Sequence, residues 1–133
     1  MAYVGEVEAQ PDGPRVWSRA PLTAQHPQWP RMRSRWLIAP SPEGWHDVAL
    51  SEWELDRAGW ADLHPHTETN LVVSGELHVE CQGRTVVVGA GELVQVPAGC
   101  VGRYWAPEHA RMIAVYGPNP AAENTDVIEY WEL

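Results

Sequence analysis

Apolar and polar positions alternate in short runs over much of the chain, and glycines or prolines separate these runs. In residues 77–81, Leu77, Val79 and Cys81 alternate with two polar residues, which is the period of a strand with one buried face. Gln82 and Gly83 then form a tight-turn signal, and the largely apolar residues 85–88 follow. This pattern predicts a β-hairpin over residues 77–88.

The other apolar runs after Arg35 have the lengths of strands, and they lack a sustained 3.6-residue period with helix caps. They recur at intervals of roughly 8–12 residues, which is typical of an antiparallel sandwich or barrel. The sequence therefore predicts an all-β domain over residues 35–133. Its further strands are expected in residues 36–39, 48–55, 70–74, 92–96, 102–105, 111–116 and 127–131.

Residues 1–34 have a different composition, because prolines interrupt any helix or central strand there. The same segment contains Trp17 and Trp29, which are too large and apolar for a solvated tail. We expect residues 1–34 to form an extended arm that lies over the barrel or over a partner subunit. The arm and the exposed strand edges together predict a homodimer, formed by strand exchange or sheet extension.

Length and charge narrow the class of protein further. The 133 residues fit one domain, and the net charge of −9 repels phosphate backbones, so nucleic acid is not an expected partner. No apolar run approaches the roughly 20 residues that span a bilayer, so a membrane partner is not expected either. The chain shows no secretion signal, which favours the cytoplasm. Cys81 and Cys100 are therefore expected to be free thiols in the packing.

Candidate chemistry gathers in one short segment, where Asp62, His64, His66 and Glu68 occupy alternate positions. Alternate side chains of a strand share a face, but a straight strand spreads His64 and Glu68 over about 13 Å, too far for one ion. A shared metal requires a bend, and Pro65 makes one plausible. Two imidazoles and a carboxylate suit Fe(II), with Mn, Ni or Zn as further options. A metal-free polar pocket wall is the equally weighted alternative.

Two spaced motifs in this chain resemble those of the cupin superfamily. The family's first motif runs Gly-x5-His-x-His-x(3,4)-Glu-x6-Gly, and this chain has Gly59, His64, His66, Glu68 and Gly75. Its second motif runs Gly-x5-Pro-x-Gly-x2-His-x3-Asn, and here Gly91, Pro97 and Gly99 match. The resemblance covers residues 45–117. It implies a double-stranded β-helix, or jelly roll, with a ligand pocket inside the barrel.

The chain departs from these motifs at two places. Counting back from Glu68 places the family's two metal histidines at His64 and Asp62, whereas the His-x-His pair itself is His64 and His66. Gly102 occupies the histidine position of the second motif. A compensated three-ligand site of His64, His66 and Glu68 is therefore one expectation. The substrate pocket is expected to include Asp62, Gln95 and Tyr104.

Two function classes follow from the resemblance. In the first, the chain is a metal-dependent enzyme that holds one divalent ion (Fe, Ni, Mn or Zn) and acts on a small oxygen-bearing metabolite. Dioxygenation is expected with Fe(II), and isomerisation or decarboxylation with the others; Tyr104 and Glu68 are the candidate catalytic residues. In the second, the chain is a metal-free module that binds a sugar, an amine or an organic acid. The segment 99–118 resembles cupins of ethanolamine utilisation, which lack the usual metal set. A purely structural dimerisation domain is a third reading.

Overall fold

The structure, a computed structural model, describes residues 13–133. Every regular element in this range is a β-strand, so the all-β prediction is confirmed. No helix in the described range is long and apolar enough to cross a membrane. The strands are β1 (Thr23–Ala24), β2 (Met32–Ile38), β3 (Ala49–Leu63), β4 (Glu68–Cys81), β5 (Arg84–Gly89), β6 (Leu93–Val96), β7 (Val101–Tyr116) and β8 (Asp126–Glu132).

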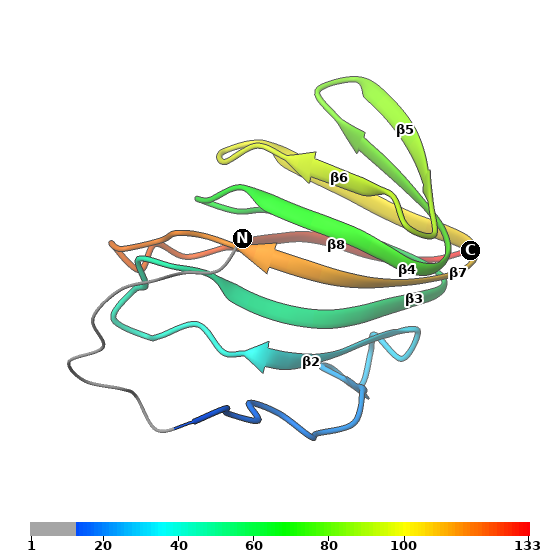
Figure 1. Cartoon of the computed structure of the whole chain (residues 1–133). Coiled ribbons are helices and arrows are strands. Elements are labelled where there is room, and N and C mark those ends of the chain that lie inside the picture. The colour runs from blue at the N-terminus through cyan, green and yellow to red at the C-terminus, as the bar shows by residue number, and fades with distance from the viewer. Residues whose placement is uncertain (1–12) are drawn as a thin grey trace, which may run out of the picture.

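All of the strand pairs are antiparallel, and their spatial order differs from their order in the chain. The main path runs β1-β2-β3-β7-β4-β5, while β6 pairs with β4 and β8 pairs with β3. Figure 1 shows β2, β3, β7 and β4 lying side by side, with the hairpin of β4 and β5 folded over one end. Such crossed connections are characteristic of a jelly roll rather than of a simple meander.

The three longest strands bend and thereby take part in both walls of the barrel. The first half of β3 pairs with β2 and with the end of β7, whereas its second half pairs with β8 and with the start of β7. The break lies at Arg57, whose φ is 49°. In β4 the break lies at Gly75, where an added Cβ would come within 2.0 Å of the His109 carbonyl oxygen. Strands that switch walls through bulges close the barrel.

These bends change the predicted strand boundaries. Residues 102–105 and 111–116 were expected as two strands, but they are the two halves of β7. The predicted strand at residues 48–55 is the first half of β3, which continues to Leu63. The predicted hairpin is confirmed, since Cys81 pairs with Arg84 across the turn at Gln82 and Gly83. These two turn residues have φ angles of 54° and 77°, as a two-residue hairpin turn requires.

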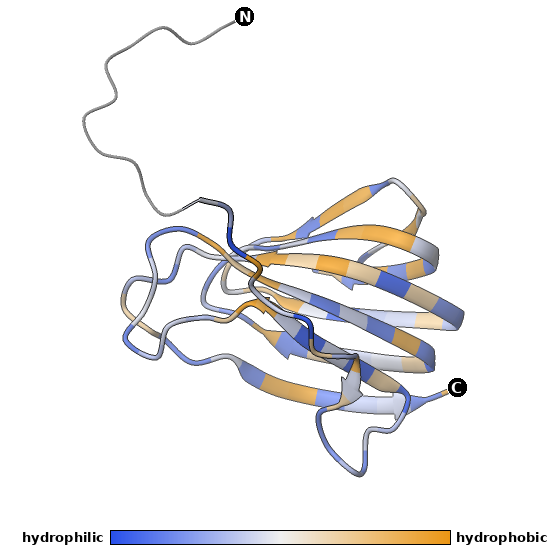
Figure 2. Cartoon of the chain, turned by 60° about the horizontal axis from the view of Figure 1, so that its bottom comes forward, coloured by the Kyte–Doolittle hydropathy of each residue, from blue (hydrophilic) through white to orange (hydrophobic). Residues whose placement is uncertain are grey.

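The core lies between the two walls and is formed by alternate residues of the long strands. Figure 2 shows hydrophobic and hydrophilic segments following one another along the strands. Leu55, Val72, Leu77 and Met112 are fully buried. Each such side chain stabilises the fold by about 1.5–3 kcal/mol relative to an exposed one. Both cysteines are free and pack against this core, in line with the prediction of free thiols.

The N-terminal segment joins the barrel earlier than predicted. Of the expected arm, residues 1–12 lie outside the described residues, and residues 13–22 contain no strand. From Thr23 onward the chain is part of the sheet, because β1 pairs with β2 and β2 begins at Met32. Trp29 packs edge-on against Trp60, with ring centroids 4.9 Å apart. The predicted boundary at residues 34 and 35 therefore falls inside β2.

Candidate metal centre

A cavity of about 400 Å³ occupies the end of the barrel at which the connections 40–48, 64–67 and 117–125 meet. Its wall includes five large aromatic side chains, those of Trp36, Trp45, Trp53, Trp60 and Tyr116. Asp62, His64, His66 and Glu68 line the same cavity. This combination of an apolar wall and a few convergent polar groups is typical of a small-molecule site.

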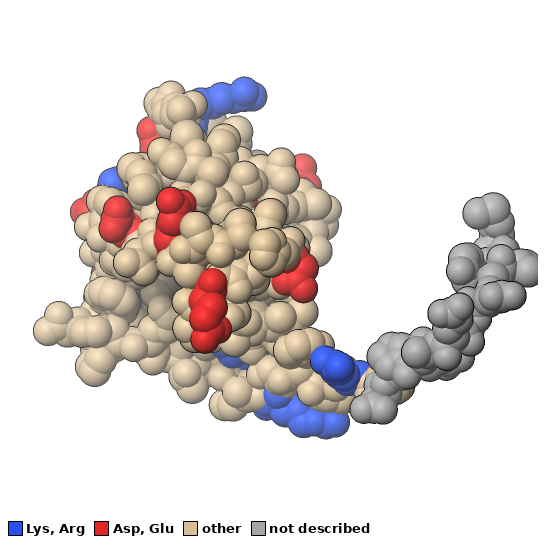
Figure 3. Space-filling model, turned by 90° about the vertical axis from the view of Figure 1, so that its left-hand side faces the viewer, with Lys and Arg blue, Asp and Glu red and all other residues tan. Residues whose placement is uncertain are grey.

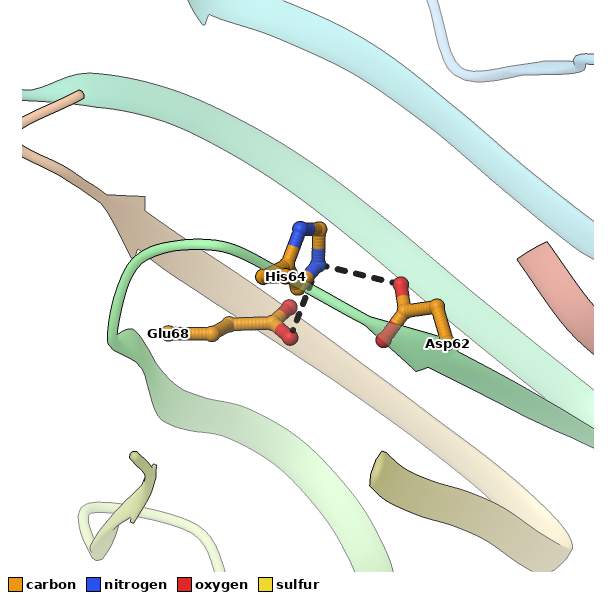
Figure 4. A group of neighbouring side chains, drawn as sticks. All are labelled: Asp62, His64 and Glu68. Carbon is orange, nitrogen blue, oxygen red and sulfur yellow. Dashed lines mark ion pairs between the residues drawn. The ribbon is translucent and has the colours of Figure 1, made fainter. Parts of the chain in front are cut away.

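The connection between β3 and β4 brings the polar groups together. β3 ends at Leu63, the chain bends at Pro65 and His66, and β4 begins at Glu68. The bend that a shared site requires is therefore present. Ligand atoms of Asp62, His64 and Glu68 lie within 4.8 Å of one another. Figure 4 shows the imidazole of His64 directed at both carboxylates.

His64 is the central member of this group. Its Nε2 lies 3.0 Å from Asp62 Oδ2 and 3.3 Å from Glu68 Oε2. Its other ring nitrogen, Nδ1, lies 2.6 Å from Thr125 Oγ1. Burial lowers the pKa of His64, but the hydrogen bonds and charges of Asp62 and Glu68 outweigh it and raise the pKa to about 10. Without a metal, His64 is therefore an imidazolium between two carboxylates.

Each carboxylate of the group also accepts a hydrogen bond from an aromatic side chain, on the same oxygen that faces His64. The indole Nε1 of Trp60 donates to Asp62 Oδ2 over 2.9 Å. The hydroxyl of Tyr104 donates to Glu68 Oε2 over 2.8 Å. Tyr104 itself is fully buried, and burial together with the charge of Glu68 raises its pKa well above the ordinary value. Its hydroxyl therefore stays protonated and keeps donating.

The residues predicted for the site are only partly brought together. His66 lines the cavity, but it is not a member of the close group, because its Nδ1 bonds to the carbonyl of Thr67 and its ring stacks on His64 at 4.8 Å. Burial lowers the pKa of His66, so the imidazole is neutral. Asp62, rather than His66, is the third member of the close group. The prediction that Gln95 belongs to the pocket is wrong. Its side chain is exposed on β6 and donates to Thr69 Oγ1.

Three residues of the site carry no clear signal in the sequence. Tyr116 lines the cavity, and its hydroxyl lies 2.8 Å from Ser51 Oγ. Burial raises its pKa well above the ordinary value, so the phenol remains a donor. Asn70 is fully buried beside the cavity wall, where its Oδ1 accepts from Trp53. Its Nδ2 has no hydrogen-bond partner among the described residues.

The donor set of the group fits a divalent transition metal. One imidazole and two carboxylates provide nitrogen and oxygen ligands of the kind that Mn, Fe and Zn accept. Ligands of bound metals are commonly fixed by outer hydrogen bonds, and all three residues have one here, from Thr125, Trp60 and Tyr104. A divalent ion would also neutralise the two carboxylates.

The surroundings of this end of the molecule are acidic. Figure 3 looks onto that end and shows Asp and Glu side chains scattered over the face, while Arg side chains lie at its periphery, several of them along the lower edge. Asp47, Glu123 and Asp126 are acidic residues near the connections of this end. Acidic residues near the mouth favour the approach of cations over anions.

The fold and the site together define a small jelly-roll protein with a ligand cavity inside its barrel. A family model described as "cupin domain" matches residues 51–116. The chain belongs to the cupin superfamily. Its fold and its structural neighbours support a cupin that binds a small molecule. A search of curated protein sequences found no match to the chain.

Several solved structures are similar to the chain. The EutQ protein of Clostridium difficile is 25% identical, with a TM-score of 0.57 over 65% of this chain and 68% of that one. KdgF from a Halomonas species is 20% identical, with a TM-score of 0.61 over 74% of this chain and 88% of that one. An RmlC-like cupin from Shewanella frigidimarina is 20% identical, with a TM-score of 0.61 over 75% and 85%. The last two similarities establish the shared fold.

Proposed function

We propose that the chain is a metal-dependent enzyme that acts on a small oxygen-bearing metabolite in the barrel cavity. Asp62, His64 and Glu68 would hold one divalent transition-metal ion. The observation that carries this proposal is the convergence of three ligand atoms within 4.8 Å, each on a residue with its own outer hydrogen bond. With two carboxylates, the set is oxygen-rich, which favours Mn²⁺, Fe²⁺ or Zn²⁺ over softer ions.

The bound ion would supply Lewis-acid polarisation of a substrate oxygen, as in the isomerisation or decarboxylation of an enol, a diketone or a hydroxy acid. Around it, the protein's own residues orient the substrate. Tyr116 presents a protonated phenol to the cavity, and Ser51 holds that phenol in place. The indoles of Trp36, Trp45 and Trp60 form apolar walls that exclude water from the reacting group.

The buried position of Tyr104 assigns it a different role from the one expected. It contacts Glu68 but is not among the residues that line the cavity. A group that cannot touch the substrate does not act as a catalytic acid. We therefore infer that Tyr104 positions Glu68, and that Tyr116 is the phenol that meets the substrate.

Metal analysis of protein purified without chelator or added metal tests the proposal. The expected result is one equivalent of Mn, Fe or Zn per chain, lost in His64→Ala and in Asp62→Asn. His78→Ala is a matched control, because His78 also contacts a carboxylate, Glu76, over 3.0 Å but on the surface. The proposal is wrong if the protein is purified metal-free and takes up no ion on addition of Mn²⁺, Fe²⁺ or Zn²⁺.

A metal-free binding module is the second candidate, and one observation favours it. His64 Nε2 lies close to both carboxylates, so a protonated His64 satisfies the group without an ion. In that case the cavity would hold a small polar ligand, and its affinity would be the same in EDTA and in added metal. A library of small amines, sugars and organic acids, screened by thermal shift with and without EDTA, separates the two candidates.

We also propose that two copies associate through the free edge of β8. Within residues 13–133, β8 pairs with β3 alone, so its other edge is unpaired. Val127 and Ile128 on this strand are 52% and 51% exposed. An unpaired edge with exposed apolar side chains favours sheet extension. Light scattering is expected to give twice the chain mass of 14.9 kDa, and the mass of Ile128→Glu should fall to one copy. A monomeric wild-type mass contradicts this.

A further inference from the structure

Thr125 contacts His64 through the ring nitrogen that does not face the carboxylates. Its Oγ1 lies 2.6 Å from Nδ1, whereas Nε2 is directed at Asp62 and Glu68. The pairing of β3 with β8 explains this contact. Asp62 pairs with Val127 and Leu63 with Asp126, so the antiparallel register continues to place Thr125 opposite His64. The contact is therefore fixed by the sheet.

Thr125 also belongs to the loop that borders the cavity, residues 117–125, which we call the rim loop. Four of its residues, 122–125, line the cavity. Asn119 anchors the loop, because its backbone exchanges hydrogen bonds of 2.9 and 3.1 Å with Trp45. The side chain of Asn119 bonds to both the carbonyl and the amide of Glu123. The loop thus has a defined shape and connects the cavity mouth to the candidate metal centre at Thr125.

We propose that Thr125 is a positioning residue that holds Nε2 of His64 toward the two carboxylates and so couples binding of a divalent ion to the stability of the rim loop. The inference rests on the proposed function, since the ion is one of the two coupled partners. A histidine ring has broad freedom about its second torsion, and a hydrogen bond at Nδ1 removes that freedom. Coupling is reciprocal: a loop that favours the ion must itself be favoured by the ion.

Three variants separate this role from a general effect on the fold. Thr125→Val removes the hydroxyl at nearly constant shape, and Thr125→Ser keeps it. Thr69→Val is the matched control, because its hydroxyl accepts from Gln95 on the outer surface. We expect Thr125→Val to weaken Mn²⁺ binding about 10- to 100-fold, while the other two bind as the wild type does. Wild-type affinity in Thr125→Val overturns the inference.

Amide hydrogen exchange measures the coupling between ion binding and the rim loop without an activity assay. Saturating Mn²⁺ is expected to slow amide exchange in residues 119–125 of the wild type and of Thr125→Ser. In Thr125→Val, saturation with Mn²⁺ should leave exchange in the rim loop unchanged. Equal slowing in the wild type and in Thr125→Val, or none in the wild type, overturns the coupling.

One measurement distinguishes failure of this inference from failure of the proposed function. If the wild type binds no ion, the proposed metal dependence fails, and the coupling fails with it. The positioning role is then decided in the metal-free protein by the nitrogen-detected spectrum of His64. A slowly exchanging Nδ1 proton in the wild type and Thr125→Ser, lost in Thr125→Val, supports it. The absence of that proton in the wild type contradicts it.

Discussion

The phenol ring of Tyr104 lies in the space that a side chain at position 102 would fill. A Cβ added to Gly102 would come within 2.8 Å of the Tyr104 hydroxyl and of the ring carbon Cε2. From this position the hydroxyl reaches Glu68 over 2.8 Å. The family's second motif has a histidine where this chain has Gly102. The glycine therefore removes one potential ligand and makes room for the residue that holds another.

The first prediction concerns the hydroxyl of Tyr104. Tyr104→Phe keeps the ring and its edge contact with Trp53, but it removes the donor to a buried carboxylate. We expect the free energy of unfolding to fall by about 1–3 kcal/mol in urea titrations with EDTA. Binding of Mn²⁺ is expected to weaken by about tenfold or more.

Tyr130→Phe is the control for this prediction, because its hydroxyl also donates to a carboxylate, that of Glu132, but at an exposed position. The control should leave Mn²⁺ binding unchanged. Equal effects of the two variants on Mn²⁺ binding would show that Tyr104 has no special relation to the site.

The second prediction concerns the space at Gly102. Gly102→Ala forces a methyl group against a fully buried ring that is packed on Trp53, so the ring cannot yield cheaply. We expect a loss of about 1–3 kcal/mol in the free energy of unfolding. Gly89→Ala should cost less, since its Cβ would meet only Glu92 Oε1, at 3.4 Å. In a Tyr104→Ala background, the added cost of Gly102→Ala should shrink, and a fully additive cycle would refute the steric explanation.

The third prediction concerns the proton on His64. Its pKa of about 10 means that the metal-free protein is protonated there at neutral pH. Ion binding through Nε2 must displace this proton, so the apparent affinity for Zn²⁺ or Mn²⁺ should rise about tenfold per pH unit between pH 7 and 9. Calorimetric titration in buffers of different ionisation enthalpy measures the released proton. A pH-independent affinity argues for ligands that exclude His64.

The same proton affects the metal-free fold. The pKa of His64 is higher in the folded state than the ordinary value of 6.5. Its stabilising contribution is therefore complete below pH 6.5 and is lost as the pH rises through about 10. In EDTA, the wild type should lose stability over this range, while His64→Gln should show a flatter profile.

Much of the fold was predictable from the chain, and the exceptions have a physical reason. The hairpin at Gln82 and Gly83 was visible because one face of its first strand is polar. The second half of β3 was not, because residues 58–62 are buried on both faces and the alternation disappears. The continuity of β7 was not predictable either, because a proline such as Pro107 normally interrupts a central strand.

The candidate site was predictable in its location but not in its membership. The alternate positions of Asp62, His64, His66 and Glu68 in the sequence were enough to locate the site in this segment. Which of Asp62 and His66 joins the group depends on the bend at residues 64–67, and local sequence does not determine the direction of each side chain in a bend. Thr125 lies 61 residues away from His64 in the chain. Its role depends on the register of β8 against β3.

The last prediction concerns Glu52, which lies outside the cavity, between arginines of two neighbouring strands. Arg35 Nε reaches it over 2.9 Å and Arg111 Nε over 3.0 Å, and its side chain is 6% exposed. Burial raises its pKa, but the hydrogen bonds and charges of Arg111 and Arg35 outweigh burial and lower the pKa below 4.5.

Because the folded pKa of Glu52 is depressed, its contribution to stability is present above pH 4.5 and is lost as the pH falls through the lower folded value. Glu52→Gln leaves both guanidinium groups without a counter-charge, and we expect a loss of about 1–3 kcal/mol at pH 7. The difference from the wild type should narrow below pH 4.5. Glu129→Gln removes the partner of Arg103 at an exposed position, so its cost should stay below about 1 kcal/mol. A cost for Glu52→Gln that does not change with acidification would mean that shape, rather than charge, holds the two arginines in place.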